Sequence, residues 1–383
     1  MDSLIQKKIE YLSAYDGPPL RLMEVCGTHT AGIFKSGIRS FLSPKIRLIS
    51  GPGCPVCVTP AAYIDRCIAY ALTPKHALAS FGDMLKVPGS ERSKTRITAA
   101  PDLQMKHSNV GRSLSDIRGE GGRVEMVYAP FDVTSMAKAE PDTTFVIAAV
   151  GFETTAPAYG LLLDDLIRED IHNVKLLTSL KRAIPAIEWI CENEPDVDGF
   201  LCPGHVSVIT GSDVYLPLSL KYDKPFVIAG FEPEHLVNAI YELVQTASGQ
   251  TGQETRVPDP KGDDSSVSNL YGEAVTAGGN LRAKIILEKY FEQVSVHWRG
   301  LGEIRDSGLY LKPEYEAYDA GSRTIPSSDA DLPIGCRCAD VITGRIDPND
   351  CPLFGKTCTP DSAIGPCMVS PEGACGIWYR NVV

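Results

Sequence analysis

The chain alternates short apolar runs with longer segments in which apolar residues recur every three to four positions. Short runs of this kind are typical of buried strands, and the longer pattern is typical of amphipathic helices. The pattern predicts eight strands, at residues 20–25, 46–50, 76–81, 123–129, 143–150, 173–179, 198–202 and 225–230. The helices predicted between them include residues 59–72, 155–170, 183–194 and 233–245.

Alternation of strands and helices predicts an α/β fold, in which parallel sheets are covered by helices. Because the strands form two successive groups of four, we expect two similar parallel-sheet domains, at residues 20–141 and 142–245. A third, loop-rich domain is expected from residues 246–383, together with an N-terminal helix in residues 1–19.

The chain beyond the second group of strands is less regular. Residues 246–269 are polar and rich in Gly, Ser and Asp, which predicts a flexible insertion at a domain boundary. Residues 281–294 are predicted to be helical. The last fifty residues are rich in turn-forming residues and have little periodicity. This segment cannot build an apolar core of its own, so we expect its cysteines to hold it together.

Composition narrows the function classes. A net charge of −11 argues against nucleic acid or an anionic membrane as the main partner. No apolar run reaches the roughly 18 residues of a membrane helix, and the charged start predicts no export signal. We therefore expect a cytoplasmic location, where thiols stay reduced. Twelve cysteines in such a protein favour metal or redox chemistry over structural disulfides.

The cysteines near the start follow two predicted strands. Cys54 and Cys57 form a C-x-x-C pair just before a predicted helix, and Cys26 ends an earlier strand with His29 three residues later. Ligands in α/β sheets bind at the carboxyl ends of strands, so these side chains can converge at one edge. The first 60 residues hold seven basic and four acidic residues, and this balance predicts lowered thiol pKa values.

The spacing of this pair alone leaves two interpretations equally open, a redox dithiol and half of a zinc site. Cys26 could instead be a small buried residue, and His29 could serve only to cap a turn. Cys67 and Cys191 lie inside apolar helix patterns and are interpreted as core residues, whereas Cys202, before "PGH", stays ambiguous.

A second group of cysteines crowds the C-terminus. It contains Cys336, Cys338, Cys351, Cys358, Cys367 and Cys375. The gaps between them are long and uneven, and no histidine lies in the segment, whereas zinc sites usually use two close pairs. Widely spaced thiolates on a loop-rich segment favour an iron–sulfur cluster with four cysteine ligands. Structural zinc is the alternative.

The motifs "MEVCGTHT", "GPGCPVCVTP", "FGDMLKVPG", "GFETTAPA", "PGHVS", "AGFEP", "WRGLG" and "CPLFGKTCTP…MVSPEGAC" together resemble the HypD family of hydrogenase maturation proteins. The resemblance runs from about residue 20 to the C-terminus. It implies two α/β domains and a third domain holding a [4Fe–4S] cluster. It also implies a role in building the Fe(CN)2CO centre of [NiFe]-hydrogenase.

The resemblance also assigns residues. The family's cluster spacing, C-x12-C-x6-C-x16-C, selects Cys338, Cys351, Cys358 and Cys375, and leaves Cys336 and Cys367 outside. Its redox pair corresponds to Cys54 and Cys57, and its third essential cysteine corresponds to Cys26. Related proteins can carry a second histidine in the first motif, where this chain has Ala31, so a two-histidine role is in doubt.

The implied partners are a small HypC-type chaperone, whose N-terminal cysteine would hold the iron together with Cys26, and a HypE-type protein that donates cyanide. The Cys54–Cys57 dithiol would supply two electrons on closing to a disulfide. Glu153, His205 and Glu232 end strands of the second group and line the same cleft or, equally, cap turns and helix starts.

Three hypotheses follow. The first is a redox-active assembly scaffold. The second is an iron–sulfur-dependent disulfide reductase of the ferredoxin–thioredoxin reductase kind, which would act on an ordinary protein partner. The third is a zinc-stapled binding protein without a redox role.

Overall fold

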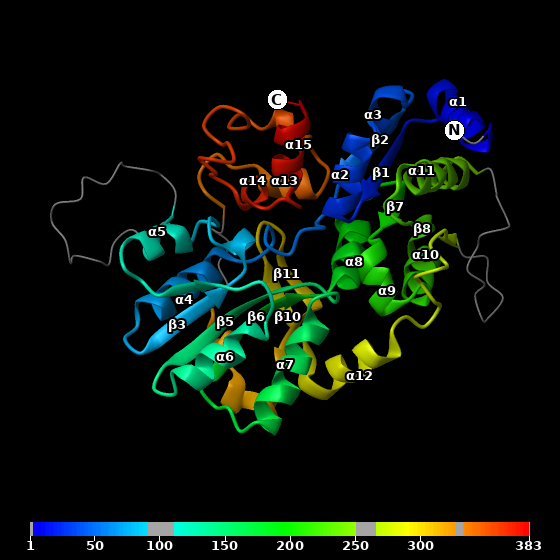
Figure 1. The fold of residues 1–383 in the computed structure, drawn as a ribbon. Helices are drawn as coiled ribbons and strands as arrows, with labels where there is room; N and C mark the ends of the chain where they lie inside the picture. Colours follow the sequence, from blue (N-terminus) through cyan, green and yellow to red (C-terminus); the bar gives the residue numbers. More distant parts are fainter. Residues whose placement is uncertain (1–2, 91–110, 250–265, 327–331, 383) are drawn as a thin grey trace.

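The computed structural model describes residues 3–90, 111–249, 266–326 and 332–382 (Figure 1). Within these ranges the chain forms an α/β fold with two sheets and a loop-rich C-terminal segment, and the predicted fold class is confirmed in these respects. Most of the predicted polar insertion, residues 250–265, lies outside the described residues.

In the part of the chain that the structure describes, the first sheet has five parallel strands in the order β2-β1-β7-β8-β9. These strands are β1 (Leu20–Glu24), β2 (Ile46–Ser50), β7 (Gly199–Cys202), β8 (Phe226–Ile228) and β9 (Val267–Asn269). Parallel strands are buried on both faces, which explains their short, nearly continuous apolar runs.

The second sheet has six strands among the described residues, in the order β10-β11-β6-β5-β3-β4. These strands are β3 (His76–Ser80), β4 (Val124–Met126), β5 (Thr144–Gly151), β6 (Val174–Lys181), β10 (Phe291–Trp298) and β11 (Gly302–Leu311). Strands β3 to β6 are parallel, and the β10–β11 hairpin adds to β6 in the antiparallel direction.

All eight predicted strands are present, but their predicted grouping is wrong. We expected residues 20–141 to form one sheet and residues 142–245 the other. Instead β1 and β2 pair with β7 to β9, and β3 and β4 pair with β5 and β6. The reason is physical: an apolar run specifies a buried strand, but it carries little information about which neighbour the strand pairs with.

Helices cover both faces of the first sheet. One face carries α1 (Ser3–Ala14), α2 (Gly27–Lys35), α3 (Ile38–Phe41) and α11 (Pro233–Ala247). The other carries α8 (Ala183–Asn193), η3 (Asp213–Tyr215) and α10 (Leu216–Tyr222), and α9 (Gly204–Thr210) follows β7. Helix α1 packs on α11, so the N-terminal helix belongs to the first sheet. We expected it to join the C-terminal segment, and this expectation is wrong.

The second sheet is covered in the same way. Helices α6 (Asp132–Ala139) and α7 (Ala156–Arg168) and the 3₁₀ turn η4 (Pro313–Tyr318) pack on one face. Helices α4 (Ala61–Leu72) and α5 (Leu114–Gly119) pack on the other face. Helix α12 (Leu281–Tyr290) lies against α7, and the short turns η1 (Gly82–Met84) and η5 (Ser322–Thr324) complete the layer.

The predicted helix at residues 281–294 ends early. Helix α12 stops at Tyr290, and β10 begins at Phe291. Apolar residues recur every second position from Val294 to Trp298, a period of two that suits a strand.

The C-terminal segment, in orange and red in Figure 1, lies beside α2 of the first sheet and above the second sheet in this view. It contains α13 (Cys338–Ile342), η6 (Pro348–Asp350), α14 (Pro366–Val369) and α15 (Ala374–Val382), joined by turns. Helix α15 packs on α2 of the first sheet, while the cysteines of the segment share one apolar core with α4 of the second sheet. The segment therefore touches both halves of the molecule.

No helix in the described ranges has both the length and the apolar character that crossing a bilayer requires.

The β10–β11 hairpin is anchored by Trp298, so Trp298→Ala should destabilise the protein strongly. Trp298 is fully buried, donates from Nε1 to Ser307 at 2.8 Å and stacks near Phe152. Removing a buried aromatic side chain typically costs about 3–5 kcal/mol. Urea unfolding should report this loss, whereas Tyr128→Ala, at an exposed position, should leave the midpoint unchanged. Equal midpoints for the two variants would contradict this account.

Candidate functional site

Cys26 lies where β1 meets α2. Its backbone is extended, and it occupies the N-cap position of α2. The N–H groups of Thr28 and His29 donate to the sulfur, which favours the thiolate, but burial outweighs them and raises the pKa of the Cys26 thiol. The prediction of a lowered pKa is therefore wrong for Cys26, because the side chain is only 9% exposed and loses its hydration.

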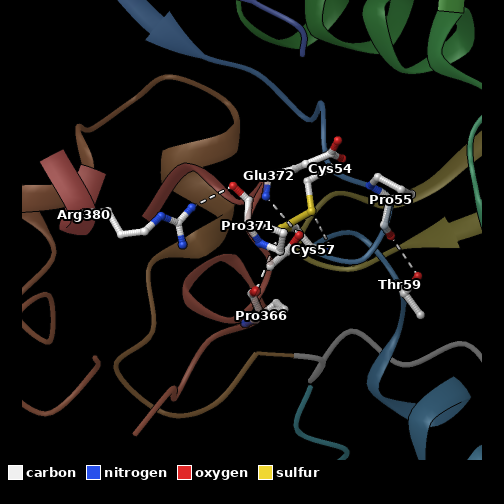
Figure 2. The surroundings of a disulfide bond; sticks show 9 residues. Cys54, Pro55, Cys57, Thr59, Pro366, Pro371, Glu372 and Arg380 are labelled. Atoms are coloured by element: carbon white, nitrogen blue, oxygen red, sulfur yellow. Dashed lines mark hydrogen bonds between the residues drawn. A yellow bond between two sulfur atoms is a disulfide. The ribbon is translucent and has the colours of Figure 1, made fainter. Parts of the chain in front are cut away.

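Cys54 and Cys57 lie on the loop between β2 and α4. The structure joins them in a disulfide, with Cα atoms 5.3 Å apart (Figure 2). The backbone N–H of Cys57 lies 3.2 Å from the sulfur of Cys54, and Thr59 Oγ1 donates to the carbonyl of Pro55 at 2.9 Å. These contacts fix a tight turn immediately before α4, as the sequence predicts.

One small pocket is lined by all three of these cysteines, and the expected convergence is confirmed. Parallel pairing of β1 and β2 places the ends of both strands at the same edge. Gly53 lets the two loops touch, because a Cβ at Gly53 would lie 2.8 Å from the Cα of Cys26. Such a distance excludes any larger residue unless the backbone moves.

The C-terminal segment forms the remaining wall of this pocket. Ile342, Glu372 and Ala374 contribute to the lining. The backbone of Glu372 packs on Gly27 so closely that a Cβ there would overlap it. Figure 2 shows the Glu372 side chain extending over Cys54. Desolvation, followed by the charge of Asp83, raises the pKa of Glu372, and the Glu372 charge adds to the raised pKa of Cys26.

A second pocket lies within the C-terminal segment. Five of the six cysteines line it, together with apolar side chains: Cys336, Cys338, Cys351, Cys358, Cys375, Val341, Leu353, Phe354 and Met368. The sixth, Cys367, contacts the thiol of Cys338, and this contact and burial raise its pKa. A Cβ at Gly365 would lie 2.5 Å from the sulfur of Cys336 and 2.7 Å from that of Cys338, so these sulfurs fill the space beside the glycine.

The donor set of this second pocket suits an iron–sulfur cluster. Its sulfurs are soft ligands in an apolar setting, and Cys338 and Cys375 lie in the first turns of α13 and α15, where an anionic group is favoured. The N–H of Ile364 points to the Cys358 sulfur at 3.4 Å, a contact of the kind that tunes clusters. Within the described ranges, no group of three or more His, Cys, Asp or Glu side chains is set to hold one metal ion.

The two cysteine sites adjoin. The Cys57 sulfur lies 3.9 Å from the carbonyl oxygen of Pro366, the residue before Cys367. A single apolar core contains cysteines from both sites, namely Cys54, Cys57, Cys338, Cys358, Cys367 and Cys375. The disulfide is therefore in packed contact with the segment that carries the candidate cluster ligands.

Comparison with known proteins identifies the family. A family model named HypD, described as "Hydrogenase formation hypA family", matches residues 3–382. The chain belongs to the HypD family. It is 36% identical to the hydrogenase maturation factor HypD of Escherichia coli K12, over 98% of this chain and 93% of that protein.

Other HypD proteins are equally similar. The hydrogenase maturation factor HypD of Azotobacter vinelandii is 38% identical, over 94% of this chain and 88% of its own length. That of Rhizobium leguminosarum bv. viciae is 38% identical, over 92% of this chain and 86% of its own length. The resemblance seen in the motifs is thus confirmed over nearly the whole chain.

His29 does not line the pocket formed by Cys26, Cys54 and Cys57. Its ring is fully buried, Nε2 lies 3.2 Å from the carbonyl of Ala229, and the ring stacks on Phe231 at 4.7 Å. Burial lowers its pKa to about 4, so the ring is neutral at physiological pH. Its position is that of a core residue that joins α2 to the end of β8.

The three other residues predicted to line the cleft are dispersed. Glu153 is buried and accepts hydrogen bonds from the N–H of Ala183, at the start of α8. His205, on α9, stacks on Phe231 at 4.1 Å, and Glu232 is the N-cap residue of α11. None of the three lines the cysteine pocket. Of the two interpretations we kept open, the structural one fits Glu153 best.

Several residues that shape the cysteine pocket were not among the predicted site residues. Glu372 lies in "MVSPEGAC", a motif whose cysteines alone attract attention, and Ser50 is the last residue of a predicted strand. Gly27 and Gly53 were recognised only as part of motifs. A signal was available: glycine beside cysteine at two strand ends indicates close backbone approach.

Gly53→Ala should open the cysteine pocket. The new methyl group would overlap the backbone of Cys26, so one of the two loops must shift. We expect alkylation of Cys26 by iodoacetamide in the native protein to become at least several-fold faster. Gly119→Ala is the matched control, because a Cβ there meets no atom within 4 Å. An unchanged rate for Gly53→Ala would show that the loops are not in the contact described.

His29 should make stability depend on acid pH. Its folded pKa of about 4 lies below the ordinary value of 6.5, so the unfolded state binds the proton more readily. The contribution is full above pH 6.5 and is lost as pH falls from 6.5 towards 4, by about 3 kcal/mol. Urea unfolding of His29→Gln should show a flatter pH profile over this range. His172→Gln, at an exposed position, should keep the parent slope.

Proposed function

We propose that this chain is a hydrogenase maturation factor that acts as a redox-active scaffold for assembly of an Fe(CN)2CO centre. The observation that carries the proposal is the single pocket lined by Cys26, Cys54 and Cys57, with the C-terminal cysteine segment packed against it. Three sulfurs in one pocket can serve two roles: two sulfurs exchange electrons, and the third binds a metal.

Four cysteines of the C-terminal segment would hold a [4Fe–4S] cluster. The family spacing selects Cys338, Cys351, Cys358 and Cys375. All four line the second pocket, which supports the assignment, but Cys336 lines it too. A bound cluster supplies or accepts single electrons. The protein residues contribute soft thiolates, apolar walls and N–H groups aimed at sulfur, such as that of Ile364.

Cys54 and Cys57 would form the two-electron store. The dithiol releases two electrons and two protons when its sulfurs join, and the reverse step takes up the same number. The turn held by Thr59 and Pro55 brings the two sulfurs together in the disulfide. Contact of Cys57 with Pro366 supports exchange of electrons with the C-terminal segment, because no solvent-filled gap separates them.

Cys26 would bind the iron that is being assembled, which is the cargo of the reaction. Iron carrying cyanide and carbon monoxide prefers soft thiolate ligands. The raised pKa of Cys26 keeps it a thiol until a metal displaces the proton. A HypC-type chaperone would supply a second thiolate from its N-terminal cysteine, and a HypE-type protein would deliver cyanide.

The alternative is a cluster-dependent disulfide reductase that acts on an ordinary protein partner. The contact between the disulfide and the C-terminal cysteine segment favours the reductase and the scaffold equally. The presence of Cys26 in the same pocket favours the scaffold, because a reductase needs only the disulfide. Structural zinc, the third hypothesis, makes no use of this contact.

The cluster ligands can be tested one at a time. Serine at Cys338, Cys351, Cys358 or Cys375 should reduce iron content and the absorption of the brown protein near roughly 400 nm, as expected for a cluster that loses a thiolate. Serine at Cys367 should leave both intact. The decisive pair is Cys336→Ser and Cys338→Ser, since both sulfurs face the same pocket. If only Cys336→Ser loses iron, the family spacing selects the wrong member of this pair. Zinc in place of iron in the purified parent protein would favour the third hypothesis.

Cys26 distinguishes the scaffold from the reductase. A complex of this chain with a HypC-type chaperone should show infrared bands of iron-bound cyanide and carbon monoxide. Cys26→Ser should abolish these bands, because the iron loses a thiolate ligand, and the Cys54–Cys57 disulfide should still form under mild oxidation. The closed disulfide can be measured by differential alkylation. Bands that survive in Cys26→Ser would rule out this cysteine as the iron ligand.

A further inference from the structure

Among the described residues that line the cysteine pocket, one polar group has no hydrogen-bond partner. Ser50 is the last residue of β2 and pairs in register with Glu24 of β1. It is 7% exposed, and its hydroxyl oxygen is closed to solvent. No hydrogen bond reaches this oxygen from any described residue. Ser50 nevertheless lines the same pocket as Cys26, Cys54 and Cys57.

The other polar side chains of this pocket have partners or reach water. Thr30 Oγ1 donates to the carbonyl of Cys26 at 3.3 Å. Glu372 lines the pocket but keeps part of its surface exposed to solvent. A buried hydroxyl without a partner costs about 1–3 kcal/mol, so its presence beside three sulfurs needs a reason. A ligand that enters the pocket and accepts a hydrogen bond supplies one.

The dimensions of the pocket limit this ligand. The enclosed space is about 10 Å³, close to the minimum needed for a single water. The described lining includes no Lys or Arg, so nothing there would neutralise a carboxylate or a phosphate. The acceptor must therefore be the end atom of a small, weakly charged group. The nitrogen of an iron-bound cyanide has this size and accepts hydrogen bonds.

We propose that the hydroxyl of Ser50 donates a hydrogen bond to a cyanide ligand of the iron held by Cys26. The inference rests on the proposed function, because it assumes that Cys26 binds the iron. Ser50 would then be a positioning residue: it makes no bond to the metal, and it orients and retains one diatomic ligand. No proton is transferred and no covalent bond changes.

The test uses the complete complex with the HypC-type chaperone and compares the parent chain with Ser50→Ala. A hydrogen bond at the nitrogen stiffens the carbon–nitrogen bond. Ser50→Ala should therefore keep the iron and shift the cyanide bands to lower wavenumber, changing the separation between them. Because alanine is smaller than serine and suits the end of a strand, the fold should be retained, as circular dichroism can check.

Ser43→Ala is the matched control. Ser43 is also buried and precedes β2, but its hydroxyl donates to the carbonyl of Tyr15 and does not line the cysteine pocket. It should leave the cyanide bands in place. If the bands are lost in Ser50→Ala but not in Ser43→Ala, and the fold is intact, the contact is also supported. The hydrogen bond from Ser50 would then be needed to retain the iron.

Two outcomes separate this inference from the proposed function. Cyanide bands unchanged in Ser50→Ala, together with their loss in Cys26→Ser, would overturn the role of Ser50 and leave the scaffold standing. The space beside Ser50 would then hold only a water. Bands retained in Cys26→Ser would overturn the proposed function itself, and the inference about Ser50 would fall with it.

Discussion

Close backbone contact between the two ends of the chain is the constraint on which the site depends. The turn before α15 rests on the first turn of α2, and the space at Gly27 admits no side-chain atom beyond hydrogen. Gly53 and Gly365 repeat the same condition, one against Cys26 and the other against two C-terminal sulfurs. Three positions without a Cβ therefore allow sulfurs from residues more than 300 apart in the chain to belong to one packed region.

Packing also determines the direction in which the pKa values of the buried cysteines shift. A helix start and nearby basic residues are expected to lower a thiol pKa, and the N–H groups at the start of α2 do act on Cys26 in that direction. Burial against a segment from the other end of the chain reverses the result. Desolvation raises the pKa of Cys358 as well, ahead of any opposing hydrogen bond. A cysteine-rich core of this kind holds protons firmly until a metal or a disulfide replaces them.

Much of the local structure could be predicted from the sequence, because period and apolar runs are local properties. The eight strands and the convergence of Cys26 with the C-x-x-C pair follow from them. The pairing of β1 with β7 does not, since Leu22 pairs with Gly199, about 177 residues away, and neither strand carries a local pattern that selects the other. Glu372 and Ser50 were missed for a related reason: their importance comes from contacts between distant segments, and neither carries a pattern of its own.

The interleaved order of the strands bears on how the protein is made. The first sheet is complete only when β9 has been added, and the second only after the β10–β11 hairpin, although both begin within the first eighty residues. Non-local pairing of this kind slows folding, and during synthesis on the ribosome the early strands must wait for late ones. The last wall of the cysteine pocket arrives with residues 372 and 374. A nascent chain thus cannot complete the pocket until residues 372 and 374 have been synthesised and have folded against the loops that carry Cys26 and Cys54.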